Sequence, residues 1–216
     1  MATTLYKLAE QAQRRLAGGQ PSRDTAVKIQ ELIIAAQQAY AQIVKINLFE
    51  NRRAGEYDVN GAFIYTFEDV PVSFDTKKNL YYCDLPSTYI ALPHEMGIAQ
   101  VSSMKSQFIN FVRVNPNFIS QSFNLKIGGL LGHKGYWAEN NKLFFVNMDK
   151  INSNDNVLIK MVVALDNIDP YEDELGIPPE IAEQIVQTVF EKYVAMQVNL
   201  PEDKINNNKK PVAGGS

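Results

Sequence analysis

Side chains suited to acid–base chemistry are few in this sequence. His94 and His133 are the two histidines, the residues whose ordinary pKa suits proton transfer near neutral pH. Neither has a second histidine at the spacing of a metal site. His94 follows Leu92-Pro93, where a solvent-facing loop residue is the favoured interpretation. A general base would need a nucleophile or metal partner that the sequence does not reveal, so we predict no catalytic residue and no metal site.

A glycine-rich stretch from Gly128 to Gly135 has the composition of a phosphate-binding loop. A P-loop places Lys directly after glycine and a hydroxyl residue directly after that Lys. Here His133 precedes Lys134, and glycine stands where the hydroxyl residue is required. We therefore predict a long hairpin that binds no nucleotide. Leu130 and Leu131 at its tip are candidate residues for a subunit contact, unless they fold back on the sheet.

The other residues with chemical potential are expected to be structural. The acidic stretch Asp166–Pro170 lacks the glycine and the terminal glutamate of an EF-hand, so a solvated loop is favoured over a calcium site. Cys83 lies in an apolar strand pattern, where a packed thiol is commoner than a reactive one. Trp137, Phe144 and Phe145 are expected in the core, because no basic residues interleave them as on a base-stacking platform. No cofactor is predicted.

Composition limits the classes of protein. The chain has 216 residues, of which 45% are apolar and 21% charged, as in folded globular proteins. Its net charge of −3 offers no basic surplus for binding duplex DNA. A single cysteine excludes an internal disulfide and a cysteine-based zinc site, and fits a reducing compartment. No uninterrupted apolar run is long enough to span a membrane, and no signal-peptide core follows Met1, so we expect the protein to work or assemble where it is made.

Helical periodicity is confined to the two ends of the chain. We predict helices over Thr4–Ala17, Asp24–Asn51 and Pro179–Asn199. The long second helix has one apolar seam, which comprises Ile29, Ile33, Ala36, Tyr40, Ile43 and Asn47. It suits either a core helix of an α+β domain or a scaffold helix whose other face meets a neighbouring subunit. In the second case Ala35 and Ala39 are candidate interface residues, because small side chains allow close approach.

The middle of the chain has the texture of β-structure. Short runs of β-branched and aromatic residues alternate with turn signals, among them Thr76–Asn79 and Glu139–Asn141. The predicted strands are Phe63–Phe67, Val70–Phe74, Leu80–Cys83, Ile98–Met104, Ile109–Val114, Phe123–Ile127, Tyr136–Ala138, Leu143–Val146 and Val157–Leu165. Strands at this spacing without intervening helices predict an antiparallel sandwich or a small barrel. The last strand is the most apolar and is therefore expected at the centre of a sheet.

The sequence thus predicts an α+β fold. Residues 1–54 form an N-terminal helical hairpin, and residues 55–168 form a large β-rich insertion. Residues 169–200 contain a C-terminal helix that packs on the N-terminal helices to form a helical layer.

Residues 201–216 form a polar C-terminal tail. This tail is too poor in apolar residues to offset its own ordering entropy, so we expect it to gain order on a neighbouring chain or along its own subunit. Adding a strand to an exposed sheet edge is the expected mode. The candidate docking residues are Ile205, Asn206, Lys209, Lys210 and Val212.

Two segments carry a resemblance to a known class of virion protein. Asp84–Pro93, followed by Gly97–Val101, resembles a segment of virion structural proteins from crAss-like bacteriophages. Gly176–Ile181, leading into an amphipathic helix, resembles them too. The order of helices, β-module, helix and polar tail is similar to head-to-tail connector proteins, the ring or adaptor proteins of tailed phages. The β-module is larger than in small, mostly helical adaptors, which leaves open which ring of the stack this chain would form.

The resemblance implies a non-enzymatic function. A connector of this kind forms a dodecameric homo-oligomeric ring beneath the portal protein and contacts adjacent ring or tail proteins. DNA passes through its channel without specific binding, and the protein resides in the virion after assembly in the host cytoplasm. Two other hypotheses remain: a tail or baseplate component with a β-rich binding module, and an enzyme with an unrecognised site.

Overall fold

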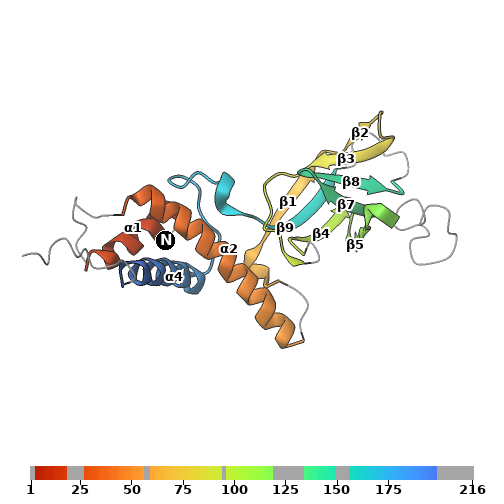
Figure 1. Cartoon of the computed structure of the whole chain (residues 1–216). Coiled ribbons are helices and arrows are strands. Elements are labelled where there is room, and N and C mark those ends of the chain that lie inside the picture. The colour runs from red at the N-terminus through yellow and green to blue at the C-terminus, as the bar shows by residue number, and fades with distance from the viewer. Residues whose placement is uncertain are drawn as a thin grey trace, which may run out of the picture. The chain divides into compact units, whose positions relative to one another are not determined.

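The computed structural model describes residues 3–18, 27–55, 59–93, 96–118, 134–148 and 156–198 (Figure 1). Its contacts divide the chain into two compact units, one of residues 1–39 and 170–216 and one of residues 40–169. The described α-helices are α1 (Leu5–Leu16), α2 (Ile29–Arg53) and α4 (Pro179–Val198). The described strands are β1 (Ile64–Val70), β2 (Ser73–Asp75), β3 (Leu80–Asp84), β4 (Ile98–Ser103), β5 (Ser106–Asn110), β6 (Val112–Arg113), β7 (Gly135–Glu139), β8 (Lys142–Val146) and β9 (Val157–Val162). The predicted α+β class, with helices near both ends of the chain, is confirmed.

Helix α1 begins and ends where its sequence signals lie. The Thr4 hydroxyl accepts a hydrogen bond from the Lys7 N–H at 3.3 Å, which satisfies one of the free donors of the first turn. Gly18, with φ of 67°, follows the cap residue Ala17 and takes the left-handed conformation that ends many helices. The buried stripe of α1 comprises Leu5, Leu8, Ala9 and Ala12.

Helices α1 and α4 pack within the first unit. Arg15 on α1 donates to Glu183 at 2.5 Å and to Gln187 at 3.2 Å, both on α4. Lys192 on α4 also donates to Gln38 on the first half of α2, at 3.0 Å. These side chains are exposed, so the ion pair adds little stability, about 1 kcal/mol at most. Buried Ile185, Val186 and Val189 of α4 supply apolar contact area. The first unit therefore contains α1, α4 and the first half of α2, whereas the sequence predicted a layer that includes the whole long helix.

Helix α2 differs from the prediction at both ends. It begins at Ile29 instead of Asp24 and continues to Arg53, beyond Asn51. The buried side chains that line it are Leu32, Ile33, Ala35, Ala36, Ala39, Tyr40, Ile43, Val44 and Leu48. The seam was therefore placed correctly at most of its positions, but the buried stripe is wider. Residues from Tyr40 onward belong to the second unit, whereas the sequence placed the boundary after residue 54.

The second unit contains two sheets. One has the strand order β1-β9-β4-β5, and the other has β2-β3-β8-β7-β6. Neighbouring strands are antiparallel, except that the short β6 runs parallel to β7. β9 lies between β1 and β4, which confirms that the most apolar strand is central. It ends at Val162, and Leu165 belongs to a short 3₁₀ turn (Leu165–Asn167) and not to the strand.

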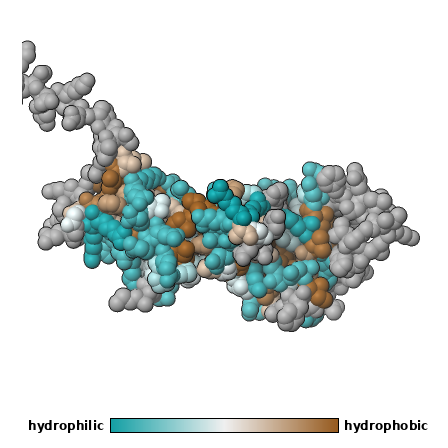
Figure 2. Space-filling model, turned by 90° about the horizontal axis from the view of Figure 1, so that it is seen from below, coloured by the Kyte–Doolittle hydropathy of each residue, from teal (hydrophilic) through white to brown (hydrophobic). Residues whose placement is uncertain are grey.

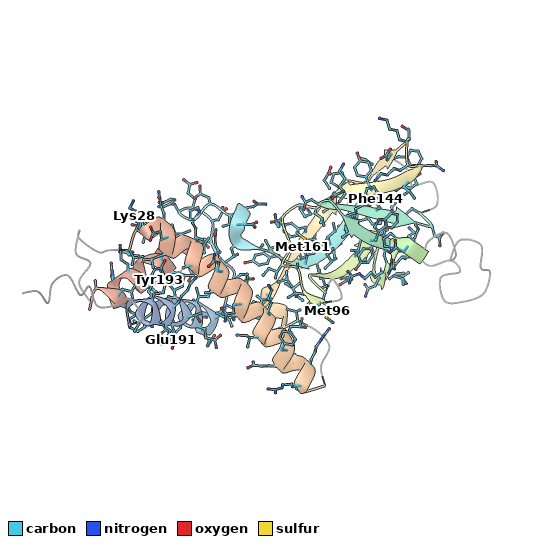
Figure 3. All side chains as sticks on the ribbon, viewed as in Figure 1. Lys28, Met96, Phe144, Met161, Glu191 and Tyr193 are labelled. Atoms are coloured by element: carbon cyan, nitrogen blue, oxygen red, sulfur yellow. The ribbon has the colours of Figure 1, made fainter. Side chains whose placement is uncertain are left out.

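The core of this unit draws on both sheets, so the two sheets form a sandwich and not a barrel. Val101, Ile159 and Met161 come from the first sheet, and Leu143 and Phe145 come from the second. All are buried, and Met161 is seen among the core side chains in Figure 3. Alternate residues of a strand point to opposite faces, which explains why Phe144, labelled in the same figure, belongs to a different cluster from Phe145.

Asparagines and an aspartate make the tight turns of the second sheet. Asn140 and Asn141 join β7 to β8 with φ of 50° and 61°, the conformation of a two-residue type I′ hairpin. Between β2 and β3, the Asp75 carboxylate accepts hydrogen bonds from the N–H groups of Lys77 at 2.8 Å and Lys78 at 3.2 Å. The backbone N–H of Lys78, then that of Lys77, lowers the pKa of this carboxyl group. Both turns were predicted from composition.

The segment that carries the family resemblance crosses from one sheet to the other. It leaves β3 at Asp84 and reaches β4 at Ile98. On the way the Ile90 N–H donates to the Val162 carbonyl at 2.8 Å, and the Val162 N–H donates to the Gly97 carbonyl at 2.8 Å. These bonds hold the crossover against the end of β9. The motif therefore has a structural role within this chain.

Two of the predicted strands are divided in the structure, and a third lies outside the described residues. The strand expected over Ile109–Val114 is divided into β5 and β6 at the buried Phe111, where the chain passes from one sheet to the other. The strand expected over Val70–Phe74 is divided between the end of β1 and β2, because Pro71 lacks the N–H that a continuous ladder requires. The strand predicted at Phe123–Ile127 lies outside the described residues.

We expect Gly97→Ala to destabilise the second unit by about 1–3 kcal/mol, the usual cost of overpacking. A Cβ at Gly97 would lie 2.2 Å from the Ile90 carbonyl oxygen and 2.6 Å from Tyr89 Cδ2. Gly61→Ala is the matched control, because a Cβ there meets nothing within 4 Å. Chemical denaturation of both variants measures the difference. Equal stability of the two variants would contradict this account of the crossover.

Candidate interaction surfaces

The alanines predicted to meet a neighbouring subunit are covered within the chain. Ala35 is 3% exposed and Ala39 is 4% exposed. They belong to the buried stripe of α2, because small residues also allow close packing inside a subunit. The interface prediction for these two residues needs this correction: glutamate at either position would disrupt the fold of the monomer as well as any assembly.

Large apolar side chains are exposed elsewhere on the molecule. Figure 2 shows apolar residues in brown as separate patches among hydrophilic surface. The exposed large apolar residues of the described ranges are Ile34, Ile46, Phe49, Phe74, Ile109, Val112, Tyr171 and Met196. Isolated cases are ordinary on a protein surface, so the ones that gather on one element carry the interest.

The second half of α2 exposes two such residues on one face. Ile46 is 46% exposed and Phe49 is 55% exposed. They are three residues apart, so they are neighbours on the helix surface. The opposite side of this half-helix is held in place, because Tyr40 packs edge-on against Phe63 with ring centroids 6.0 Å apart. Arg52 Nη2 also contacts Met96 Sδ at 3.2 Å, and Met96 is labelled in Figure 3.

Sequence reasoning missed this exposed face. A signal was present: Ile46 and Phe49 lie off the seam predicted for α2, as does Ile34. An apolar residue off the seam is exposed unless another element covers it, and periodicity does not reveal whether one does.

A second exposed apolar pair lies where β5 passes into β6. Ile109 is 61% exposed, and Val112 beyond the buried Phe111 is also exposed. β5 and β6 are the edge strands of their sheets. Edge strands present backbone groups to which another chain can add a strand. β5 and β6 therefore lie at the kind of position where the sequence analysis expects an extended segment to dock.

The acidic segment after β9 is exposed and fixed at both ends to the N-terminal segment of the first unit. The Tyr6 N–H donates to the Pro170 carbonyl at 2.9 Å, and the Leu175 N–H donates to the Thr3 carbonyl at 2.7 Å. Between these two bonds lie Tyr171, Glu172, Asp173 and Glu174, all exposed. The ring centroids of Tyr6 and Tyr171 are 5.0 Å apart. No three His, Cys, Asp or Glu side chains of the described ranges are grouped to hold a metal ion.

Aromatic residues on the outer face of the second sheet form their own cluster. Trp137 stacks on Phe144 with centroids 5.3 Å apart, and both rings are buried, as predicted. The argument that basic residues are absent from this region was wrong. Lys78 lies over the Phe144 ring and Lys142 over the Tyr82 ring, each with Nζ 4.3 Å from the centroid. Lys78 lies in the turn between β2 and β3, and Lys142 is the first residue of β8, so the pairing of β3 with β8 places each lysine beside a ring that is distant in sequence.

The glycine-rich stretch has a packing role at its described end. A Cβ at Gly135 would lie 2.5 Å from Val114 Cγ2 and 2.7 Å from Val146 Cγ2, so glycine is required where β7 begins. Residues 128–133 of the stretch lie outside the described residues, among them Leu130, Leu131 and His133, and so does His94. The tail candidates are outside them too: Ile205, Asn206, Lys209, Lys210 and Val212.

Comparison with known proteins yields no relative for this chain: no protein-family model matches it, and neither does any curated protein. Of the helices in the described ranges, none combines the length and the apolar character needed to cross a membrane.

We expect Cys83 to resist alkylation in the native protein at pH 8 and to react once the chain is denatured. Its thiol is 1% exposed, and burial, followed by the charge of Asp84, raises its pKa from 9.0 to about 12. Because the folded state keeps a proton that the unfolded state loses, this group lowers stability as the pH rises from 9.0 toward 12. Mass spectrometry of labelled protein measures the reaction. Rapid native labelling would contradict a packed thiol.

Proposed function

We propose that this protein is a structural subunit of a tailed-phage virion, a head-to-tail connector that forms a homo-oligomeric ring beneath the portal. The observation that carries the proposal is the order and content of the elements. Two N-terminal helices and one C-terminal helix enclose a β-sandwich in the sequence, and a polar tail follows. This is the organisation that the connector resemblance implies.

The exposed apolar surfaces support an assembly function. Ile46 and Phe49 on α2 and Ile109 on β5 offer contact area that a monomer leaves in water. A ring subunit needs two different surfaces, because each copy contacts the next one head to tail. The surface of α2 and the edges of the sandwich are different surfaces of one chain. The mildly acidic net charge of −3 also suits a wall along which DNA slides without sticking.

A tail or baseplate component is the second candidate. The observation that favours it is the exposure of Ile109 and Val112 on strands at the edges of their sheets, because sheet edges are used to bind an extended peptide from another protein. In this alternative the sandwich binds a tail protein and the helical unit attaches the subunit to the particle. The position of the protein in the virion distinguishes the two candidates.

We expect the purified protein to form closed rings and to be located at the neck of phage particles. Native mass spectrometry and negative-stain images of the protein measure ring formation. Antibody-labelled images of virions give its position, with virions that lack the protein as the control. Labelling at the baseplate would favour the second candidate. A monomer that is absent from virions would contradict both.

We expect removal of residues 206–216 to leave a folded protein that no longer docks onto the portal. The physical reason is that a tail docked on the portal would bind it through backbone groups and through Lys209 and Lys210, which the deletion removes. Co-sedimentation with portal rings measures docking, and circular dichroism checks the fold. Replacement of Asn207 and Asn208 by Ser is the control, because it keeps the length and both lysines. Unchanged docking after the deletion would exclude this role.

A further inference from the structure

We propose that the exposed face on the second half of α2 binds a second copy of this chain, at the acidic segment Tyr171–Glu174. This inference rests on the proposed function, since it names the surfaces by which one ring subunit meets the next. The charges of the two surfaces, their apolar residues and the contacts that fix each surface within its own chain support this pairing.

The face of α2 is basic as well as apolar. Lys45 and Arg53 are exposed and lie one turn before and one turn after Phe49, so all three share the face that also carries Ile46. Glu50 is the acidic residue among the exposed positions of this helical segment. Glu50 lies four residues after Ile46 and three before Arg53, so the face has an apolar centre and, with Lys45 and Arg53, two positive charges against one negative charge. Arg53 is the last residue of α2, where a cation suits the helix dipole.

The acidic segment has the complementary character. Residues 161–191 contain eight aspartates and glutamates and no lysine or arginine. Within this stretch Glu172, Asp173 and Glu174 are exposed beside Tyr171, a large aromatic side chain that is 56% exposed. The segment therefore presents an aromatic ring surrounded by carboxylates. Aromatic residues at the centre of a contact, with charges around them, are the usual anatomy of a protein interface.

Both surfaces are held in place before any partner binds. The acidic segment lies between the backbone hydrogen bonds of Pro170 and Leu175, at 2.9 Å and 2.7 Å. The half-helix is fixed by the packing of Tyr40 on Phe63 and by the contact of Arg52 with Met96. Little conformational entropy is lost when such surfaces meet, which favours association.

The charges also favour this pairing over a symmetric contact of α2 with itself. Two α2 faces would bring the positive ends of each close to those of the other, and two acidic segments would repel as well. A contact between one copy's helix and the next copy's segment joins opposite charges instead. Because the two surfaces differ, the contact is heterologous, and it closes into a ring if the rotation between copies permits.

Charge reversal and charge exchange test the contact. Lys45→Glu with Arg53→Glu reverses the helix face, and Glu172→Lys with Glu174→Lys reverses the segment. We expect each pair alone to raise the concentration at half-assembly about tenfold or more, since like charges then face each other. The four substitutions together restore opposite charges, and we expect assembly to return. Analytical ultracentrifugation measures the size distribution, and thermal unfolding checks that every variant is folded.

Two controls separate this contact from general effects. Lys28→Glu with Lys77→Glu makes the same change in net charge at exposed positions away from the α2 face, and we expect assembly to be unchanged. Phe49→Ala should weaken assembly about tenfold, whereas Ile34→Ala, at an exposed position on the first half of the same helix, should not. These outcomes would support the contact.

Other outcomes would overturn it. Failure of the fourfold variant to assemble, while each pair remains folded, would show that the two surfaces do not meet. Assembly that survives both reversals would show that another surface joins the subunits, and would leave the proposed ring function intact. Loss of assembly only when residues 202–216 are removed would identify the tail as the occupant instead.

Discussion

The burial of β9 is the constraint on which the second unit depends. Val157, Leu158, Ile159, Met161 and Val162 are all buried, so this strand is covered on both faces. A buried strand must also satisfy its backbone groups on both edges. β1 and β4 do so although they are far from β9 in sequence, and the crossover before β4 bonds to the end of the same strand. The sandwich is organised around that requirement.

Different contacts stabilise the two units. In the sandwich, alternate side chains of β8 divide between two apolar clusters, one in the core and one on the outer face. The first unit relies on helix packing, with the α1–α4 contact and backbone bonds that fix the segment before α4. Exposed apolar groups remain at the margins of both, on α2, at the β5–β6 junction and at Tyr171. A protein that works by assembly requires such positions, because the contacts that complete it come from another chain.

The features that suggested chemistry in the sequence are explained by packing where the structure describes them. Cys83 is a core side chain, and Gly135 is small because Val114 and Val146 leave no space for a Cβ. Gly97 has the same explanation at the crossover, within the segment that carries the connector resemblance. Residue types that look functional in isolation are often required by close approach of backbone and side chains.

The sequence by itself determined the fold class, the approximate extent of α1, α4 and most strands, the central place of β9 and the asparagine turn between β7 and β8. Each of these depends on local periodicity or on a backbone conformation that few residues adopt. It did not determine which apolar residues of α2 are covered, because a helix has several faces and the covering residues come from elsewhere in the chain. Ala35 and Ala39, the candidates for a subunit contact if α2 were a scaffold helix, are buried, while Ile46 and Phe49 are exposed. The positions of Lys78 and Lys142 over aromatic rings likewise follow from strand pairing between distant segments, which only the tertiary structure decides.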